Sequence, residues 1–232
     1  MNNIKLEPKL TSENKKIITK DWADNFPEFT IYKPMWLMRR HGPLLSGIVL
    51  DRSSGNDEYR PTSHVHCLAR PSLSIYLTLY HRLASRRTGS EDAIRVRFHY
   101  DHAKEAADRM REQINFPVSG VLSFSDVRNA YYAYMNTPEG RGSQIRMYED
   151  ILAYYTWCGW PEQARTILDA YIPIVRSWDP AIMERDGGSD GWYDKCLALI
   201  ADPDAVRLTV EEEVRKHKLK KIPDEGFNCD EC

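Results

Sequence analysis

The segment AIRVRFHYDHAKEAADRMREQI, residues 93–114, contains the change of pattern that decides the fold. Its first eight residues are rich in β-branched and aromatic side chains, as short strands are. After Tyr100 the apolar residues recur at helical spacing, at Ala103, Ala107, Met110 and Ile114. Asp101 precedes them and is a favourable helix N-cap. A β pattern therefore ends near residue 100, and a helical pattern begins there.

Upstream of this point the chain predicts a β-sheet. Between Phe29 and Tyr100 the strand-like segments are FTIYKPMWLMR, LLSGIVLDR, SHVHCLA, LSIYLTLYHRL and AIRVRFHY. The alternation is clearest over residues 73–80, where aliphatic side chains alternate with hydroxyl-bearing ones. Because the connections are short and show no helical pattern, the strands should pair antiparallel.

Downstream of residue 100 the spacing of apolar residues predicts about five to six helices. We therefore expect an α+β fold in which an N-terminal antiparallel sheet packs against a C-terminal helical layer. The predicted single domain covers residues 21–218, with a β-rich part at 29–100 and a helical part at 101–218. Residues 1–20 should form a mobile arm or a short appended helix, and residues 219–232 a flexible tail.

The stretch YEDILAYYTWCGWPEQARTILDAY, residues 148–171, is similar to a tetratricopeptide-type helical hairpin. Gly159 and Ala164 stand at the matching turn and contact positions. The resemblance covers one hairpin, no second copy follows at a 34-residue period, and a solenoid needs about three copies. It therefore predicts two antiparallel helices that meet at a glycine turn and assigns no family.

Composition indicates a soluble protein. Of the 232 residues 42% are hydrophobic, and no apolar run approaches the roughly 18 residues that a membrane span needs. The polar start lacks the apolar core of a signal peptide. Five cysteines, an odd number, favour free thiols. We expect a cytoplasmic location and no membrane partner.

Charge is distributed unevenly along the chain. Residues 1–100 contain 16 basic and 10 acidic residues, whereas residues 101–232 contain 16 basic and 24 acidic ones. Such asymmetry can indicate a charged partner, although the two halves can also neutralise each other. The candidate partner-binding residues are the acidic Glu211, Glu212 and Glu213 and the basic Arg82, Arg86 and Arg87.

The sequence His64-Val65-His66-Cys67 contains the most suggestive cluster of potential ligands. On a strand, alternate residues share a face, so both imidazoles would project in the same direction. His81 on the next strand could supply a third metal ligand, as could His99 or His102. Two histidines on a strand are more often hydrogen-bonded structural residues, so we predict no cofactor and keep the metal site of His64, His66 and His81 as an alternative.

The Cys229-Asp230-Glu231-Cys232 motif has the spacing of half a zinc site, for which His217 could be a third ligand. Its neighbouring acidic residues should raise the thiol pKa, which disfavours a redox role. A mobile tail explains the motif more simply.

Nucleophile and phosphate-binding motifs such as GxSxG, GxxxxGK[ST] and GxGxxG are missing, so we predict no catalytic residue. The leading hypothesis is a non-catalytic binding protein that recognises another macromolecule, in its concrete form an immunity-type protein that inhibits a toxin. A surplus of tyrosine and tryptophan supports it, since these residues and arginine dominate interface energetics. One alternative is a metal-dependent hydrolase built on the histidine strand. Another is an RNA-binding accessory protein that stacks bases on Tyr76, Tyr80, Phe98 and Tyr100.

Overall fold

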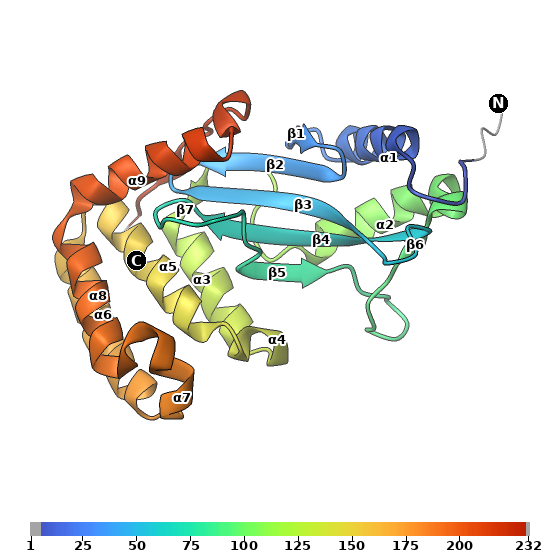
Figure 1. The fold of residues 1–232 in the computed structure, drawn as a ribbon. Helices are drawn as coiled ribbons and strands as arrows, with labels where there is room; N and C mark the ends of the chain where they lie inside the picture. The colour runs from blue at the N-terminus through green and yellow to red at the C-terminus, as the bar shows by residue number, and fades with distance from the viewer. Residues whose placement is uncertain (1–5, 231–232) are drawn as a thin grey trace.

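An antiparallel sheet forms the first half of the chain and helices form the second (Figure 1). The computed structural model describes residues 6–230, and it confirms the predicted α+β fold. The strands pair in the order β1-β2-β3-β4-β5, and β6 pairs with the beginning of β4. Their bounds are Thr30–Lys33 for β1, Trp36–His41 for β2, Leu44–Arg52 for β3, Glu58–Cys67 for β4, Leu79–Arg82 for β5 and Ile94–Arg95 for β6.

The six helices that the spacing predicts after residue 100 are all present. They are α2 (His99–Gln113), α3 (Phe124–Met135), α5 (Gln144–Trp157), α6 (Pro161–Arg176), α8 (Gly188–Ala201) and α9 (Pro203–Lys216). The structure adds α1 (Ser12–Asn25), the short helices α4 (Pro138–Arg141) and α7 (Pro180–Met183), and the 3-10 turns η1 (Val96–Phe98), η2 (Glu184–Asp186) and η3 (Leu219–Lys221). Among the described residues, none of the helices combines the length and the apolar character of a membrane span.

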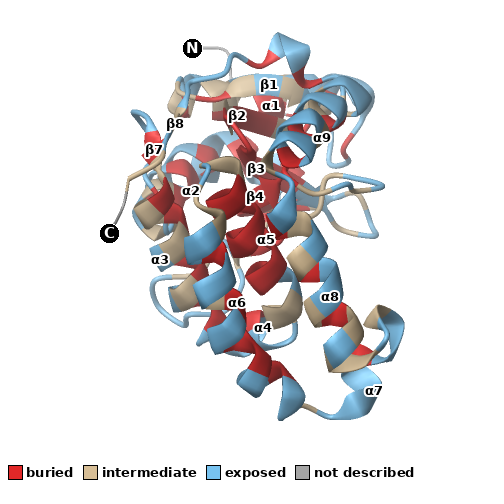
Figure 2. Cartoon of the chain, turned by 90° about the vertical axis from the view of Figure 1, so that its left-hand side faces the viewer, coloured by how far each residue is buried: buried red, intermediate tan, exposed pale blue. Residues whose placement is uncertain are grey.

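The predicted hairpin of α5 and α6 turns at Gly159, which has a left-handed φ of 81°. Ala164 is fully buried, where its small side chain lets the two helices approach closely. Figure 2 shows that α5 is the buried helix of the layer, whereas α6 and α8 each expose one face. The hairpin is therefore the centre of the helical half.

The first residues form part of the core. Helix α1 begins at Ser12 behind the N-cap Thr11 and runs past the predicted boundary at residue 20. Ile18 and Trp22 on α1 are fully buried, and they pack with α2 against one face of the sheet. For residues 1–20 we expected a mobile arm or a short appended helix. The described part is a helix, but its buried side chains belong to the core rather than to an appendage. Residues 1–5 lie outside the described residues.

The segment with the clearest strand alternation is mostly a loop. Strand β5 begins at Leu79, and residues 73–77 do not pair with another strand. Leu73 is 90% exposed while Leu79 is buried, so the predicted aliphatic face is buried only where β5 begins. The loop connects β4 to β5 across the sheet surface, and side chains take the place of a strand ladder: the backbone N–H groups of Ser72 and Tyr76 donate to Glu213 and His66.

The predicted flexible tail is a further difference. Residues 222–230 return across the molecule, where Phe227 and Asn228 form β8 beside β7 (Leu122–Ser123). Asp224 accepts hydrogen bonds from Arg40 and from the backbone N–H of Gly42. We call residues 222–230 the C-terminal strap. The last two residues, 231 and 232, lie outside the described part.

A disulfide joins the strap to the end of α5. Cys158 and Cys229 are 71 residues apart in sequence, and their Cα atoms are 5.6 Å apart. The expectation of free thiols is wrong for this pair, because the returning strap brings together two residues that look unrelated in sequence. Cys67 and Cys196 are free and buried, as expected of small apolar side chains. The disulfide also weakens the argument for a reducing compartment.

Candidate functional site

The three histidines of the predicted metal site do not converge. His64 and His66 share one face of β4, as expected from their alternation. On β5, however, His81 lies opposite Ser63, and Tyr80 lies opposite His64. Because paired residues share a face, His81 lies on the opposite side of the sheet, where its Nε2 is 3.4 Å from Gln113. A metal site formed by all three would require a change of strand register.

His64 is a core residue with no room for a ligand. Its ring is fully buried against Gly47, where an added Cβ would lie 2.6 Å from Nε2. The indole of Trp36 packs edge-on against it, with ring centroids 5.9 Å apart. Within the described residues neither ring nitrogen has a hydrogen-bond partner. Burial accordingly lowers the pKa of His64 to about 3, so the ring is neutral at physiological pH.

His66 instead belongs to a polar cluster that connects β4, the loop and α9. The hydroxyl of Ser72 lies at its centre, 2.7 Å from Oε2 of Glu213, 3.3 Å from Nε2 of His217 and 3.4 Å from Nε2 of His66. His217 donates from Nε2 to the same carboxylate oxygen at 3.0 Å. The four side chains come from positions up to 151 residues apart. We call His66, Ser72, Glu213 and His217 the polar clamp.

Two histidines and a glutamate are also a common set of metal ligands, and their ligand atoms lie within 4.8 Å of one another. The hydrogen bonding of His66 opposes this use. The backbone N–H of Tyr76 donates to Nδ1 of His66 at 3.2 Å, so the proton of the neutral ring is on Nε2. A metal-bound imidazole normally donates from its second nitrogen, whereas here that nitrogen accepts. The clamp therefore fits a hydrogen-bond network better than a metal centre.

The ionisation of the clamp agrees with this assignment. Burial lowers the pKa of His66 to about 4, and the neighbouring His217 contributes to the same shift. Burial alone would raise the pKa of Glu213, but hydrogen bonds from Ser72 and Lys216 outweigh it and lower the pKa. A neutral His66 and an ionised Glu213 are the states that satisfy every hydrogen bond of the clamp at neutral pH.

A cavity of about 220 Å³ lies beside the clamp. His66 and Thr78 contribute to its floor, and the loop residues Ser72 and Tyr76 form one wall. The guanidinium of Arg146, in the first turn of α5, stacks on the Tyr76 ring with 4.6 Å from its central carbon to the ring centroid. The clamp thus holds the loop in place as the wall of a polar cavity.

Arg70 fixes the other end of this loop to α5. It donates to Asp150 at 2.6 Å and forms an ion pair with Glu149. Both carboxylates are buried, and Glu149 also accepts from the indole N–H of Trp192 at 3.1 Å. These contacts join the loop, α5 and α8 into one network. Removing both carboxylates would leave the Arg70 guanidinium without a charged partner.

The predicted partner-binding acids divide into two groups. Glu211 and Glu212 are exposed on the outer face of α9, whereas Glu213 is only 3% exposed and belongs to the polar clamp. The prediction that Glu213 binds a partner is therefore wrong, because its carboxylate is buried. Lys216, four residues after Glu212, forms its ion pair with Glu213 at 3.1 Å. The two roles therefore fall on consecutive residues of one helical turn.

The predicted basic residues lie on the β5–β6 loop side, and two of them have acidic partners. Arg82 pairs with Glu91, and Arg86 pairs with Glu112 at 2.6 Å. These pairs reduce the positive charge that this surface offers to a partner. Arg87 lines a shallow cavity of about 380 Å³ on the same side.

The exposed acids of α9 border an open groove of about 520 Å³. Leu208, which is 59% exposed, lies one turn before Glu211 and Glu212 and also lines it. Arg40, Arg215 and Lys220 also line the groove, and Arg40 is paired with Asp224 of the strap. The groove thus has an apolar contact point with charged residues around it.

Sequence reasoning missed the polar clamp and the groove for different reasons. Glu213 and His217 are spaced four residues apart on a helical pattern, which indicates a shared face but not the partner beneath it. Ser72 carries no local signal, because its role depends on the return of α9 over the loop. The exposure of Leu208 could have been found, since it falls outside the buried stripe of Val206, Val210 and Glu213.

Comparison with protein-family models, with curated proteins and with solved structures finds no match to this chain.

Proposed function

We propose that this protein is a non-catalytic binding protein that recognises a cationic macromolecule through the groove of α9. The observation that carries the proposal is the exposed Leu208 in an open groove beside Glu211 and Glu212. Interfaces typically combine a desolvated apolar anchor with a charged rim. Here the leucine would be the anchor and the two carboxylates the rim.

The charge of the surrounding helices supports a basic partner. Residues 161–216 contain twelve acidic and seven basic residues. Glu211 and Glu212 form no ion pair within the described residues, so their charge is available to a partner. Complementary charge speeds encounter and selects partners more than it adds affinity.

A rigid scaffold supports the same proposal. The polar clamp attaches α9 to the sheet through Glu213 and His217, and the hydroxyl of Tyr32 donates to the carbonyl of His217 at 2.8 Å. A surface that is ordered before binding loses less entropy on association. The clamp then has a structural task, which is to hold α9 in position.

An immunity-type protein that inhibits a cationic toxin is the concrete form of the proposal. An RNA-binding role has less support, because Tyr76 packs beside His66 and Tyr80 packs on Tyr134. Phe98 and Tyr100 are exposed, but they lie at the start of α2, whereas Tyr76 is in the loop before β5 and Tyr80 is on β5.

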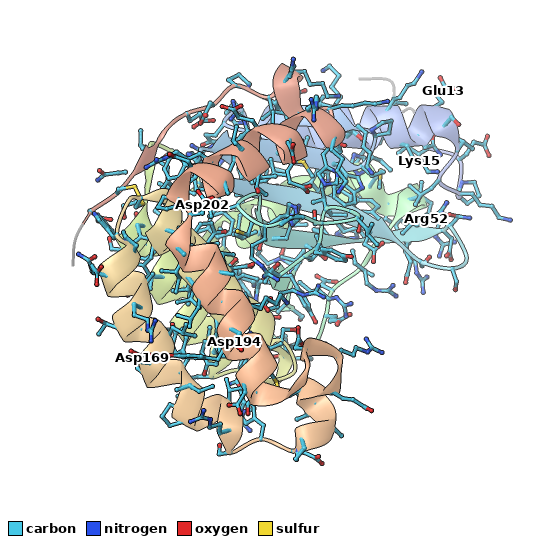
Figure 3. The ribbon with its side chains drawn as sticks, turned by 60° about the vertical axis from the view of Figure 1, so that its left-hand side comes forward. Glu13, Lys15, Arg52, Asp169, Asp194 and Asp202 are labelled. Atoms are coloured by element: carbon cyan, nitrogen blue, oxygen red, sulfur yellow. A yellow bond between two sulfur atoms is a disulfide. The ribbon has the colours of Figure 1, made fainter. Side chains whose placement is uncertain are left out.

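Site-specific photo-crosslinking tests the proposal. A photoreactive amino acid is placed at Leu208, and in a matched control at Glu13, which is exposed on α1 at the other end of the molecule from Asp202 at the start of α9 (Figure 3). We expect one basic macromolecule to be crosslinked at position 208 and not at position 13. Equal adducts at both positions, or an acidic adduct at position 208, would contradict the proposal.

A further inference from the structure

The cavity beside the polar clamp contains polar groups that the clamp does not use. Thr78 is 5% exposed and lines the cavity. The strand register continues from Tyr80 opposite His64, so Thr78 lies beside His66 on the same face of the sheet. Within the described residues the Thr78 hydroxyl has no hydrogen-bond partner. Its oxygen is accessible from the cavity, so the hydroxyl can donate a hydrogen bond to a ligand bound there.

A cationic group faces the same cavity from its rim. Arg146 lines it and forms no ion pair within residues 6–230. Its stacking on Tyr76 fixes the plane of the guanidinium and leaves the N–H edge available. The first turn of α5, which carries Arg146, contains no acidic residue and has no side-chain cap. Both features favour a negative charge at this place.

The remaining charges limit the ligand to one negative charge. Arg70 also lines the cavity, but Glu149 and Asp150 already neutralise it. Asp150 itself lines the cavity and would repel a second negative charge. A single guanidinium with a free edge matches a carboxylate, which it can bind through two parallel hydrogen bonds.

We propose that this cavity binds a carboxylate, with Arg146 holding the charge and the Thr78 hydroxyl donating a hydrogen bond to the ligand. The volume of about 220 Å³ restricts the ligand to a small organic acid or to the terminal carboxylate of a peptide. This site is separate from the α9 groove, so the inference does not depend on the proposed function.

Two variants separate binding from folding. In Thr78→Val the shape is kept and a hydroxyl that faces the cavity is removed, so stability should change little while carboxylate affinity falls about threefold to tenfold. In Arg146→Gln the affinity should fall at least about tenfold. Arg141→Gln is the matched control, because Arg141 is an exposed arginine on α4 that does not line the cavity.

The test is an NMR titration of the wild type and the three variants with acetate, propionate, acetamide and inorganic phosphate. We expect saturable shifts with the carboxylates only, which weaken in Thr78→Val and Arg146→Gln and persist in Arg141→Gln. Titration with an acetylated dipeptide acid and with its amide then shows which source of carboxylate fits. Linear shifts for every carboxylate, or equal effects of the two arginine variants, would overturn the proposal.

Discussion

At the scale of single residues, Glu213 shows how burial assigns a role that charge alone does not. Its carboxylate accepts from the hydroxyl and the backbone N–H of Ser72 and from His217. Glu212, its neighbour, is exposed on the same helix. Two consecutive glutamates with opposite exposure therefore provide a matched pair for measuring the polar clamp.

Replacement of Glu213 by Ala should lower the free energy of unfolding by about 2–4 kcal/mol, because Ser72 and His217 lose a charged partner in a buried place. The corresponding change of Glu212 should stay within about 0.5 kcal/mol. Urea denaturation of both variants provides the comparison. A similar small loss for both would show that the clamp does not hold α9.

The two buried histidines of β4 predict a loss of stability in acid. Histidine in the unfolded chain takes up a proton below about pH 6.5, whereas His66 and His64 in the folded chain do so only near pH 4 and pH 3. Between these values the unfolded state binds more protons than the folded state. The stabilising contribution of these two histidines is therefore fully present above pH 6.5 and falls as the pH falls. The two residues together should contribute a slope of about 3 kcal/mol per pH unit near pH 5.

Unfolding free energies measured between pH 7 and pH 4 test this slope. In His64→Leu about half of it should disappear, because one of the two suppressed protonations no longer occurs. A slope that is unchanged in this variant would mean that His64 is accessible to protons in the folded protein.

At the scale of elements, the C-terminal strap shows what local patterns do not contain. Arg39 on β2 is 1% exposed and forms an ion pair with Glu225 of the strap. Phe227 packs edge-on against Trp157, with ring centroids 5.9 Å apart. Asp230 accepts from the backbone N–H of Ser125, in the first turn of α3, at 3.0 Å. The strap therefore contacts both the sheet, at β2, and the helical half, at α5 and α3.

Reduction of the Cys158–Cys229 disulfide should lower stability by about 3–4 kcal/mol, since the bond closes a loop with a sequence separation of 71. Thermal unfolding with and without a phosphine reductant measures the loss. The variant Cys229→Ser should already show the lower stability and should not respond to the reductant. A wild type that is equally stable in both conditions would show that the bond is absent in solution.

At the scale of the whole molecule, sequence patterns predicted the elements better than the connections between them. The helical spacing of apolar residues after residue 100 predicted α5, because helix formation depends on residues three and four apart. The alternation at residues 73–77 predicted a strand, but the segment is a loop, and the backbone N–H groups of Ser72 and Tyr76 donate to Glu213 and His66. The clamp and the disulfide join distant residues, and no local period encodes such contacts. The single domain over residues 21–218 stays a prediction.

In the proposed function, the exposed acids Glu211 and Glu212 beside the groove of α9 guide a cationic partner to it. The direct measurement is the association rate constant with the crosslinked partner, for the wild type, for the double variant Glu211→Lys and Glu212→Lys, and for a control with Glu7→Lys and Glu13→Lys. We predict association at least about tenfold slower in the first variant at low ionic strength, with the difference vanishing near 1 M salt and dissociation changing less. Equal association rates for the two variants at every salt concentration would contradict the claim.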